Sequence, residues 1–255
     1  MKKFVLLLCL SLFAFSLTAQ DNYYFPTEEG TVLTYKNYNA KGKPDKNTSW
    51  YTYTINKVEK KGDVTHVFFT VNFEGKEKFV KDAPSEMKNI FDNMEVVIEK
   101  DVMKIEFFNS IVGKLTAAAI STSTGSGMTA TTSGSSIKVF PLNAEVGATI
   151  PDTELKVNMS MSAQGINVST TQTTSTYNSK VVAKEDITTP AGTFACIKIS
   201  EKIKYTIGVG SMTMQNIDAG SNTWLAKNVG FVRMETLDKK GKLESYLLLD
   251  KIEKK

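Results

Sequence analysis

Side chains of alternating polarity, with a period of two residues, run along most of this chain. The pattern is clearest over residues 193–207, where one parity is apolar: Ala195, Ile197, Ile199, Ile203, Tyr205 and Ile207. The residues of the other parity are polar: Lys198, Ser200, Lys202, Lys204 and Thr206. Successive side chains of a β-strand point to opposite faces, so this pattern predicts a strand with one buried and one solvated face.

Segments of this kind recur at short spacing. Residues 31–38, 50–58 and 64–73 alternate, with turn-forming residues between them at 41–44 and 60–63. These connections are too short for a helical crossover, so they predict an antiparallel meander. Further strands are expected at 95–99, 103–108, 137–140, 154–161, 166–177, 181–184, 211–217, 223–226, 231–237 and 243–252. The chain is therefore predicted to be mainly β, as a curved antiparallel sheet or open barrel with one short helix.

The one helix is expected after Asp82. Pro84 suits a first helical turn, because its missing N–H would have no partner there. The apolar residues that follow recur at helical spacing: Met87, Ile90, Phe91 and Met94. This pattern predicts about three turns with one apolar stripe packed on the sheet.

Residues 116–136 differ in composition, being rich in Ala, Ser, Thr and Gly without a charged side chain. Such a segment buries little, which predicts a flexible loop or linker; the alternative is a lid of small residues. It would separate an N-terminal β lobe at 20–115 from a C-terminal β lobe at 137–255. A weak repeat, Phe25-Pro26 against Phe140-Pro141, leaves open two similar lobes.

The N-terminus predicts a secretory signal peptide over residues 1–19. Lys2 and Lys3 form a basic start, residues 4–15 are almost entirely apolar, and Ala19 supplies a small residue before the cut. The apolar run is shorter than the roughly 20 residues that a membrane span needs; an uncleaved anchor is the alternative. We expect an exported protein, periplasmic or at the cell surface, with no membrane span in the mature chain.

Cleavage would leave Cys196 as the only cysteine, so no intramolecular disulfide is expected. Leucines precede Cys9, whereas lipidation needs a small residue there, which argues against a lipoprotein site. Cys196 lies in an apolar strand segment and is interpreted as a small buried hydrophobic residue. A reactive thiol is the alternative.

The charge balance argues against nucleic acid as a partner. Without Lys2 and Lys3, the 31 basic residues become 29 against 27 acidic ones, a net charge of +2. Arg233 is the only arginine. Recognition of phosphates and bases favours the arginine fork, so a nearly balanced chain with one arginine fits such partners poorly.

Three stretches carry a family resemblance: Tyr23-Tyr24-Phe25-Pro26 with Gly30-Thr31, Thr-Pro-Ala-Gly-Thr-Phe at 189–194, and Thr-Trp-Leu-Ala-Lys-Asn-Val-Gly-Phe-Val at 223–232. They resemble marks of the TapB-like, domain-of-unknown-function family of uncharacterised exported bacterial proteins. The resemblance implies a curved antiparallel sheet or open barrel in the periplasm or at the cell surface. It implies no activity.

These marks have a structural interpretation. Pro190 fixes φ and Gly192 accepts positive φ, which predicts a tight turn into the strand at Thr193. Gly230 at a strand start allows another backbone or ring, such as that of Trp224, to approach closely.

The sequence offers no catalytic residues, cofactor site or metal site. His66 is the single histidine, and no nucleophile motif surrounds it. One histidine and one cysteine cannot supply a usual zinc ligand set. Residues 218–222 are a faint echo of a calcium loop and are interpreted as an ordinary turn.

Two methionine pairs have strand parity, Met159 with Met161 and Met212 with Met214, so each pair faces one side. Thioethers bind Cu(I), and they also fill irregular apolar cavities or plain core. These four residues and Trp224 are the candidate lining of a cavity or partner surface. Aromatic residues near the N-terminus are either a sugar-stacking platform or ordinary sheet packing: Tyr23, Tyr24, Trp50, Tyr51 and Tyr53.

We therefore expect an exported, non-enzymatic binding or scaffolding protein. Its partner would be an apolar or carbohydrate ligand, or another envelope protein. One alternative is an envelope protein–protein interaction module that uses an exposed sheet edge. Another is a hydrolase whose paired carboxylates come from distant strands. The oligomeric state is left open.

Overall fold

The computed structural model describes residues 23–44, 48–75, 91, 93–106, 128–163 and 166–254. The predicted signal peptide and nearly all of the predicted helix lie outside these residues. The described strands are β1 (Thr31–Asn39), β2 (Thr48–Lys61), β3 (Val64–Gly75), β4 (Met94–Glu99), β5 (Val102–Glu106), β6 (Met128–Ser135), β7 (Ile137–Pro141), β8 (Thr153–Ala163), β9 (Ile166–Thr189), β10 (Gly192–Val209), β11 (Met212–Ala226), β12 (Gly230–Leu237) and β13 (Leu243–Lys254). The mainly β prediction is confirmed.

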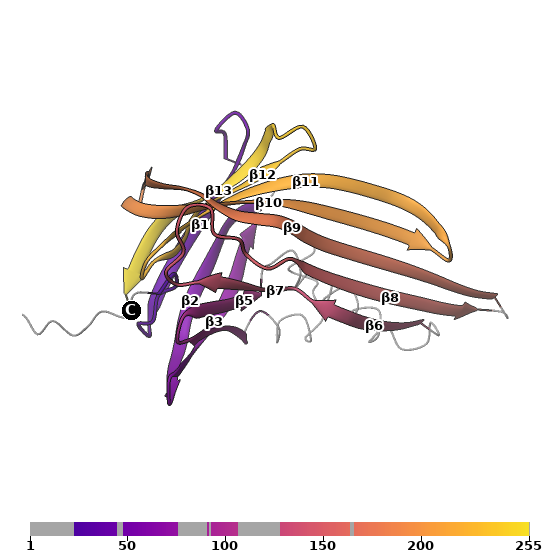
Figure 1. Ribbon diagram of the computed structural model, residues 1–255, viewed down its shortest axis with the longest axis horizontal. Coiled ribbons are helices and arrows are strands. Elements are labelled where there is room, and N and C mark those ends of the chain that lie inside the picture. The colour runs from indigo at the N-terminus through magenta and orange to yellow at the C-terminus, as the bar shows by residue number, and fades with distance from the viewer. Residues whose placement is uncertain are drawn as a thin grey trace, which may run out of the picture.

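All of these strands belong to one antiparallel sheet, in the order β6-β8-β9-β10-β11-β12-β13-β1-β2-β3-β4-β5-β7 (Figure 1). β13 pairs with β1 and β5 pairs with β7, so strands from both predicted lobes join along two borders. The segments predicted as two lobes therefore contribute their described strands to one continuous sheet. Within the described part of the chain, no helix is long and apolar enough to span a membrane.

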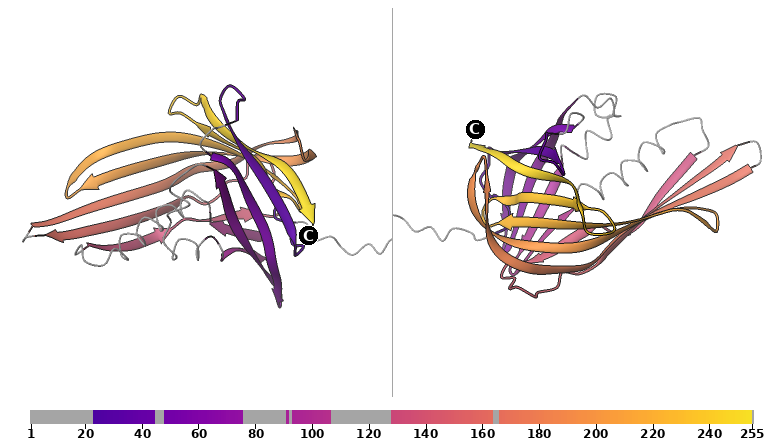
Figure 2. Two further views of the ribbon diagram at one scale, coloured as in Figure 1. Left: turned by 180° about the vertical axis from the view of Figure 1, so that it is seen from behind. Right: turned by 90° about the horizontal axis from the view of Figure 1, so that it is seen from above.

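The sheet curls until its two ends meet, which makes a nearly closed barrel (Figure 2). β6 and β7 stand at opposite ends of the strand order, yet only Ser136 separates them in the chain. The segment after β7 adds a short ladder to β9: the Ile150 amide donates to the Ser179 carbonyl and the Val181 amide to the Ala148 carbonyl, both at 2.9 Å. This ladder holds the two ends of the sheet together.

Residues 128–135, predicted to be part of a flexible loop, form β6 and pair with β8 along their length. The loop prediction is wrong for these residues, because the Ser and Thr side chains do not prevent the backbone from pairing with a neighbouring strand. Residues 218–222, interpreted as a turn, continue β11 in register with β10. In both segments the pairing with a neighbouring strand, and not the local composition, decides that the backbone is extended.

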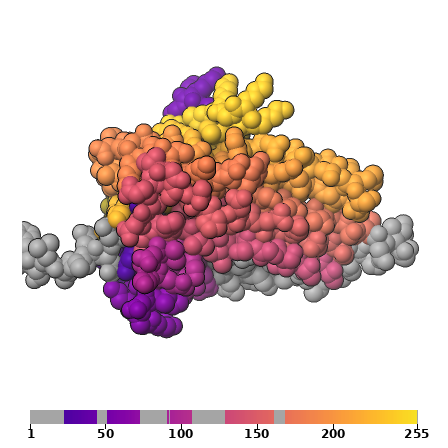
Figure 3. All heavy atoms as spheres, viewed as in Figure 1, coloured from indigo at the N-terminus to yellow at the C-terminus, as the bar shows by residue number. Residues whose placement is uncertain are grey.

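The strands β8–β11 are longer than the barrel wall requires and extend beyond it as a ribbon (Figures 1 and 2). β9 runs for 24 residues and β10 for 18. In the space-filling view this ribbon forms one continuous flank of the molecule (Figure 3).

The turn predicted at Pro190 and Gly192 is confirmed. Thr189 pairs with Gly192, so only Pro190 and Ala191 connect β9 to β10. Gly192 has a φ of 139°, a backbone conformation that favours glycine. The hydroxyl of Thr189 accepts a hydrogen bond from the Ala191 amide at 3.1 Å, which fixes the turn locally.

Gly230 has a different neighbour from the one expected. Its φ is 91°, and a Cβ there would lie 3.4 Å from the Phe25 ring and 3.6 Å from Pro26. The predicted approach of Trp224 is wrong, because the three atoms nearest to such a Cβ belong to Phe25, Pro26 and Tyr24. Phe25 is fully buried, with its ring centroid 5.1 Å from that of Phe69. The stretch at 23–26 therefore seals the barrel core against the start of β12.

One buried hydroxyl leads to a prediction. Tyr35 is 1% exposed, and among the described residues its hydroxyl has no hydrogen-bond partner. Burial raises the pKa of Tyr35, so the phenol stays neutral. Tyr35→Phe is expected to raise the free energy of unfolding by about 1 kcal/mol, because an unsatisfied buried hydroxyl costs stability. Urea denaturation measures this change, and a loss of stability would show that the hydroxyl has a partner.

Candidate functional site

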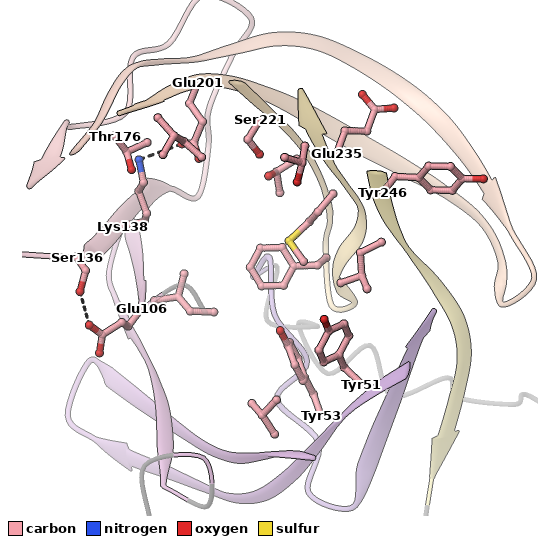
Figure 4. Close-up of a pocket in the computed structure, with 18 of the residues that line it drawn as sticks. Tyr51, Tyr53, Glu106, Ser136, Lys138, Thr176, Glu201, Ser221, Glu235 and Tyr246 are labelled. Carbon is pink, nitrogen blue, oxygen red and sulfur yellow. Dashed lines mark hydrogen bonds and ion pairs between the residues drawn. The ribbon is translucent and has the colours of Figure 1, made fainter. Parts of the chain in front are cut away.

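The barrel encloses a cavity of about 310 Å³ (Figure 4). One wall is apolar and comes from β3, β4 and β5: Phe69, Val71, Met94 and Ile105. The facing wall, from β9 to β13, is mixed. It carries hydroxyl groups, those of Thr174, Thr176, Ser221, Thr223, Thr236 and Ser245, and apolar side chains, those of Ile203, Phe231, Met234 and Leu247. The volume is at the lower end of the roughly 300–1,000 Å³ found for small-molecule sites.

Two tyrosines of β2, Tyr51 and Tyr53, point into the hollow (Figure 4). The Tyr53 ring lies 5.0 Å from Tyr35 and 5.5 Å from Phe69, which holds it in place. Burial raises the pKa of Tyr53, and neighbouring Tyr51 adds to the rise. Tyr53 is therefore a neutral phenol that donates as well as accepts. Of the other predicted platform residues, Tyr24 is buried in the core and does not line the cavity.

Lys138 of β7 and Glu201 of β10 form a buried ion pair in the cavity wall. The Nζ of Lys138 lies 3.0 Å from Oε2 of Glu201, and their side chains are only 4% and 14% exposed. The hydroxyl of Ser179 in β9 accepts from Lys138 at 3.3 Å and donates to Glu201 at 3.2 Å. Each buried charge thus has a partner, which offsets the cost of removing it from water.

A second polar contact lies nearby on the cavity wall. Ser136, the single residue between β6 and β7, is buried and its hydroxyl donates to Glu106 at the end of β5 (Figure 4). Ser136 and Lys138 together fix the point where the chain leaves one end of the sheet and joins the other.

Sequence reasoning missed both charged residues of the ion pair, although a signal for each is present. Glu201 lies between Ile199 and Ile203, at the apolar parity of β10. Lys138 shares its parity with Phe140, which is buried. A charged residue at an inward-facing position needs a partner, so these two positions together indicated a buried pair.

Of the predicted methionines, Met159, Met212 and Met214 do not line this cavity. Met159 and Met161 belong to β8, whereas Met212 and Met214 belong to β11, and two strands, β9 and β10, separate them. Met159 is half-buried, and the structure does not describe the side chain of Met161. Met212 and Met214 are each 65% exposed on the ribbon. Their role in contacting a partner stays a prediction.

Trp224 is also absent from the cavity lining. It is buried on the opposite face of β11 from Thr223, packed with Cys196 and Val232. Its indole N–H donates to Oε1 of Glu185 at 2.7 Å, and Lys198 Nζ lies 4.6 Å from its ring centroid. These contacts link β9, β10 and β11, so the side chain stabilises the sheet on its outer face.

His66 faces away from the barrel core. Its Nδ1 lies 2.6 Å from Oε1 of Glu95 on the neighbouring strand β4. The buried residues of β3 have the other parity, as Thr65 and Val67 illustrate. Within the described ranges, no group of three or more His, Cys, Asp or Glu side chains is arranged to hold a metal ion.

Cys196 leads to a second prediction. The thiol is buried and donates to the Phe194 carbonyl at 3.3 Å. Burial raises the pKa of Cys196 to about 12, and the carboxylates of Asp186 and Glu185 add to the rise. Because the thiolate is the reactive form, Cys196 is expected to resist iodoacetamide at pH 8 until the protein is unfolded. Peptide mapping checks this, and rapid labelling of the native protein would contradict it.

The fold and the cavity together define a class, an antiparallel and nearly closed β-barrel protein with an internal cavity. Residues 28–249 match the family model described as DUF3108-like, and the chain belongs to this family. The resemblance to a family of uncharacterised proteins is thereby confirmed, but the TapB-like name is not supported. A search of curated proteins finds no match.

Two solved structures share the fold. One is described as a "putative exported protein with YmcC-like fold" from Bacteroides fragilis; it is 19% identical with a TM-score of 0.59 and covers 91% of this chain and 100% of its own. The other is a "putative lipoprotein" from Parabacteroides distasonis, 19% identical with a TM-score of 0.61, covering 91% of this chain and 99% of its own. At 19% identity, the similarity to these two structures shows a shared fold only.

Proposed function

We propose that this chain is an exported, non-enzymatic binding protein that holds a small ligand inside its barrel. The observation that carries the proposal is a cavity with an apolar wall on one side and, on the other, a wall where hydroxyl groups lie among apolar side chains. A few polar groups set in a largely apolar pocket are typical of ligand sites. A cavity that served only as core would be filled with side chains, because protein interiors pack densely.

The exported setting draws on two independent supports. The basic start, the apolar run and Ala19 have the pattern of a signal peptide. The two structural neighbours are described as an exported protein and a lipoprotein. An envelope location is consistent with both.

The non-enzymatic part of the proposal rests on what the inward carboxylates contact. Glu201 is engaged by Lys138 and Ser179, and Glu106 accepts from Ser136. Both carboxylates therefore have structural partners at the closure of the barrel. The alternative, a carboxylate-based hydrolase, predicts turnover in glycosidase and esterase screens that Glu201→Gln abolishes.

Native mass spectrometry of protein purified from its own envelope fraction tests the binding proposal. We expect a retained mass that is lost on denaturation and absent from Ser221→Trp, which fills the cavity. Asp218→Trp, at an exposed position on the same strand, is the matched control and should keep the mass. Absence of any retained mass, together with unchanged stability of Ser221→Trp, would show that the site is not a binding cavity.

The ribbon supports a second candidate, an envelope protein–protein interaction module. Three large apolar side chains are exposed on β11 where it extends beyond the barrel: Met212, Met214 and Ile217. Exposed apolar side chains that cluster are typical of contact surfaces. Light scattering and cross-linking in envelope extracts, compared with Met212→Gln/Met214→Gln, test this candidate.

A further inference from the structure

The hydroxyl wall is more regular than a scatter of polar residues. Glu201 pairs with Ser221 across β10 and β11, Ser221 pairs with Thr236 across β11 and β12, and Thr236 pairs with Ser245 across β12 and β13. All four residues line the cavity. They form one polar row across four neighbouring strands, with the Lys138 ion pair at its β10 end.

The spacing of this row follows from the sheet itself. Neighbouring strands lie about 4.8 Å apart, so a polar side chain is presented at each step of that length. This step is comparable to the length of one pyranose ring. A hydroxyl group both donates and accepts, so the row matches a ligand whose own groups do both.

The polar row offers no apolar surface for a ring, and the tyrosines Tyr51 and Tyr53 supply one. They enter the hollow from β2 (Figure 4), and burial keeps Tyr53 neutral. A tyrosine ring offers an apolar face for the C–H side of a sugar ring and a hydroxyl at its edge. The sequence pattern that left a sugar-stacking platform open is thus met by two of its five aromatic residues.

The lining disfavours the other ligand classes. A fatty ligand would cover the half-buried hydroxyls of Ser221 and Ser245 without offering them hydrogen-bond partners, which costs free energy for each group. An anion would meet the carboxylates of Glu106 and Glu201. Lys138, which carries the one ammonium among the described lining residues, is already paired. A neutral polyhydroxy compound offers hydrogen-bond partners to these hydroxyls and carries no negative charge for the carboxylates to repel.

We propose that the cavity binds a short neutral saccharide, with its hydroxyl groups on the row of Glu201, Ser221, Thr236 and Ser245 and a ring face against Tyr51 and Tyr53. The cavity volume suits one or two sugar units rather than a long chain. This inference rests on the proposed function, since it names the ligand class of that same site.

Calorimetric titration of the full mature chain with glucose, galactose, mannose, N-acetylglucosamine and their disaccharides tests the inference. We expect at least one of them to bind. Thr236→Val should weaken that binding about tenfold, the loss expected for one hydrogen bond. Thr213→Val, the same change at a position of β11 that does not line the cavity, should leave it unchanged. The apolar dye N-phenyl-1-naphthylamine is titrated in parallel.

The outcomes separate the two proposals. Saccharide binding that Thr236→Val weakens and Thr213→Val does not supports the inference. Saccharide binding insensitive to Thr236→Val overturns it, because the row then plays no part. Dye binding that Ser221→Trp abolishes, without saccharide binding, overturns the inference but keeps the binding function. Binding of neither probe, with no retained mass in the native protein, overturns both.

Discussion

Lys138→Met is expected to lower the free energy of unfolding by about 3–5 kcal/mol, the cost of breaking a buried ion pair by removing one partner. The methionine keeps most of the lysine's volume, so the loss reports on charge rather than on packing. Glu201 would remain buried, with Ser179 as its remaining described donor. The measurement is urea denaturation followed by circular dichroism.

The double variant Lys138→Met/Glu201→Leu is the matched control. It removes both charges together, so it is expected to recover most of the loss, because a well-packed apolar pair often replaces a buried ion pair at little cost. Lys156→Met, which breaks the exposed pair with Glu154, should change stability by less than about 1 kcal/mol. A loss for Lys138→Met no larger than that would contradict the role of the pair in closing the barrel.

Phe25→Ala is expected to lower the free energy of unfolding by about 3–5 kcal/mol, the usual cost of truncating a fully buried phenylalanine. Phe25 packs against Phe69 and fills the space beside Gly230, so its loss leaves a cavity bounded by both. Phe25 lies in the stretch at 23–26, which carries part of the family resemblance. A purely structural role for this stretch predicts that stability falls.

Phe68→Ala is the control for this truncation. Phe68 has the outward parity of β3 and is only half-buried, so the same change should cost about 1 kcal/mol. Thermal and urea unfolding of both variants give the comparison. Equal losses would show that Phe25 does not seal the core, and a stable Phe25→Ala that no longer retains its ligand would assign the stretch to binding.

The alternating pattern of β10 shows how far local sequence carries the fold. Ile197 and Ile199 are buried as their parity predicted, and the Pro190–Gly192 turn starts the strand where expected. These features depend on the backbone geometry of neighbouring residues. The sequence pattern left open whether Tyr51 and Tyr53 pack in the core or form a platform. Parity indicates which face of the strand a side chain is on, but not whether that face borders a filled core or a cavity.

β6 and the ion pair show where local sequence stops. The Ser and Thr residues at 128–135 carry little hydrophobic signal, and they form a strand because β8 supplies hydrogen-bond partners for the whole segment. Lys138 and Glu201 are 63 positions apart in the numbering, and each alone is an unexplained charge at an inward parity. Only the approach of β7 to β10 turns the two into a pair.

The sequence by itself determined which segments are extended and which parity of the central strands is buried, because side-chain alternation is a property of consecutive residues. It also determined the turn at Gly192, where φ allows few other residues. The tertiary structure decided that β13 pairs with β1, that the sheet closes at Ser136, and that a polar row faces two tyrosines across a cavity. Those features arise from hydrogen bonds and packing between residues far apart in the chain, and no local pattern specifies them.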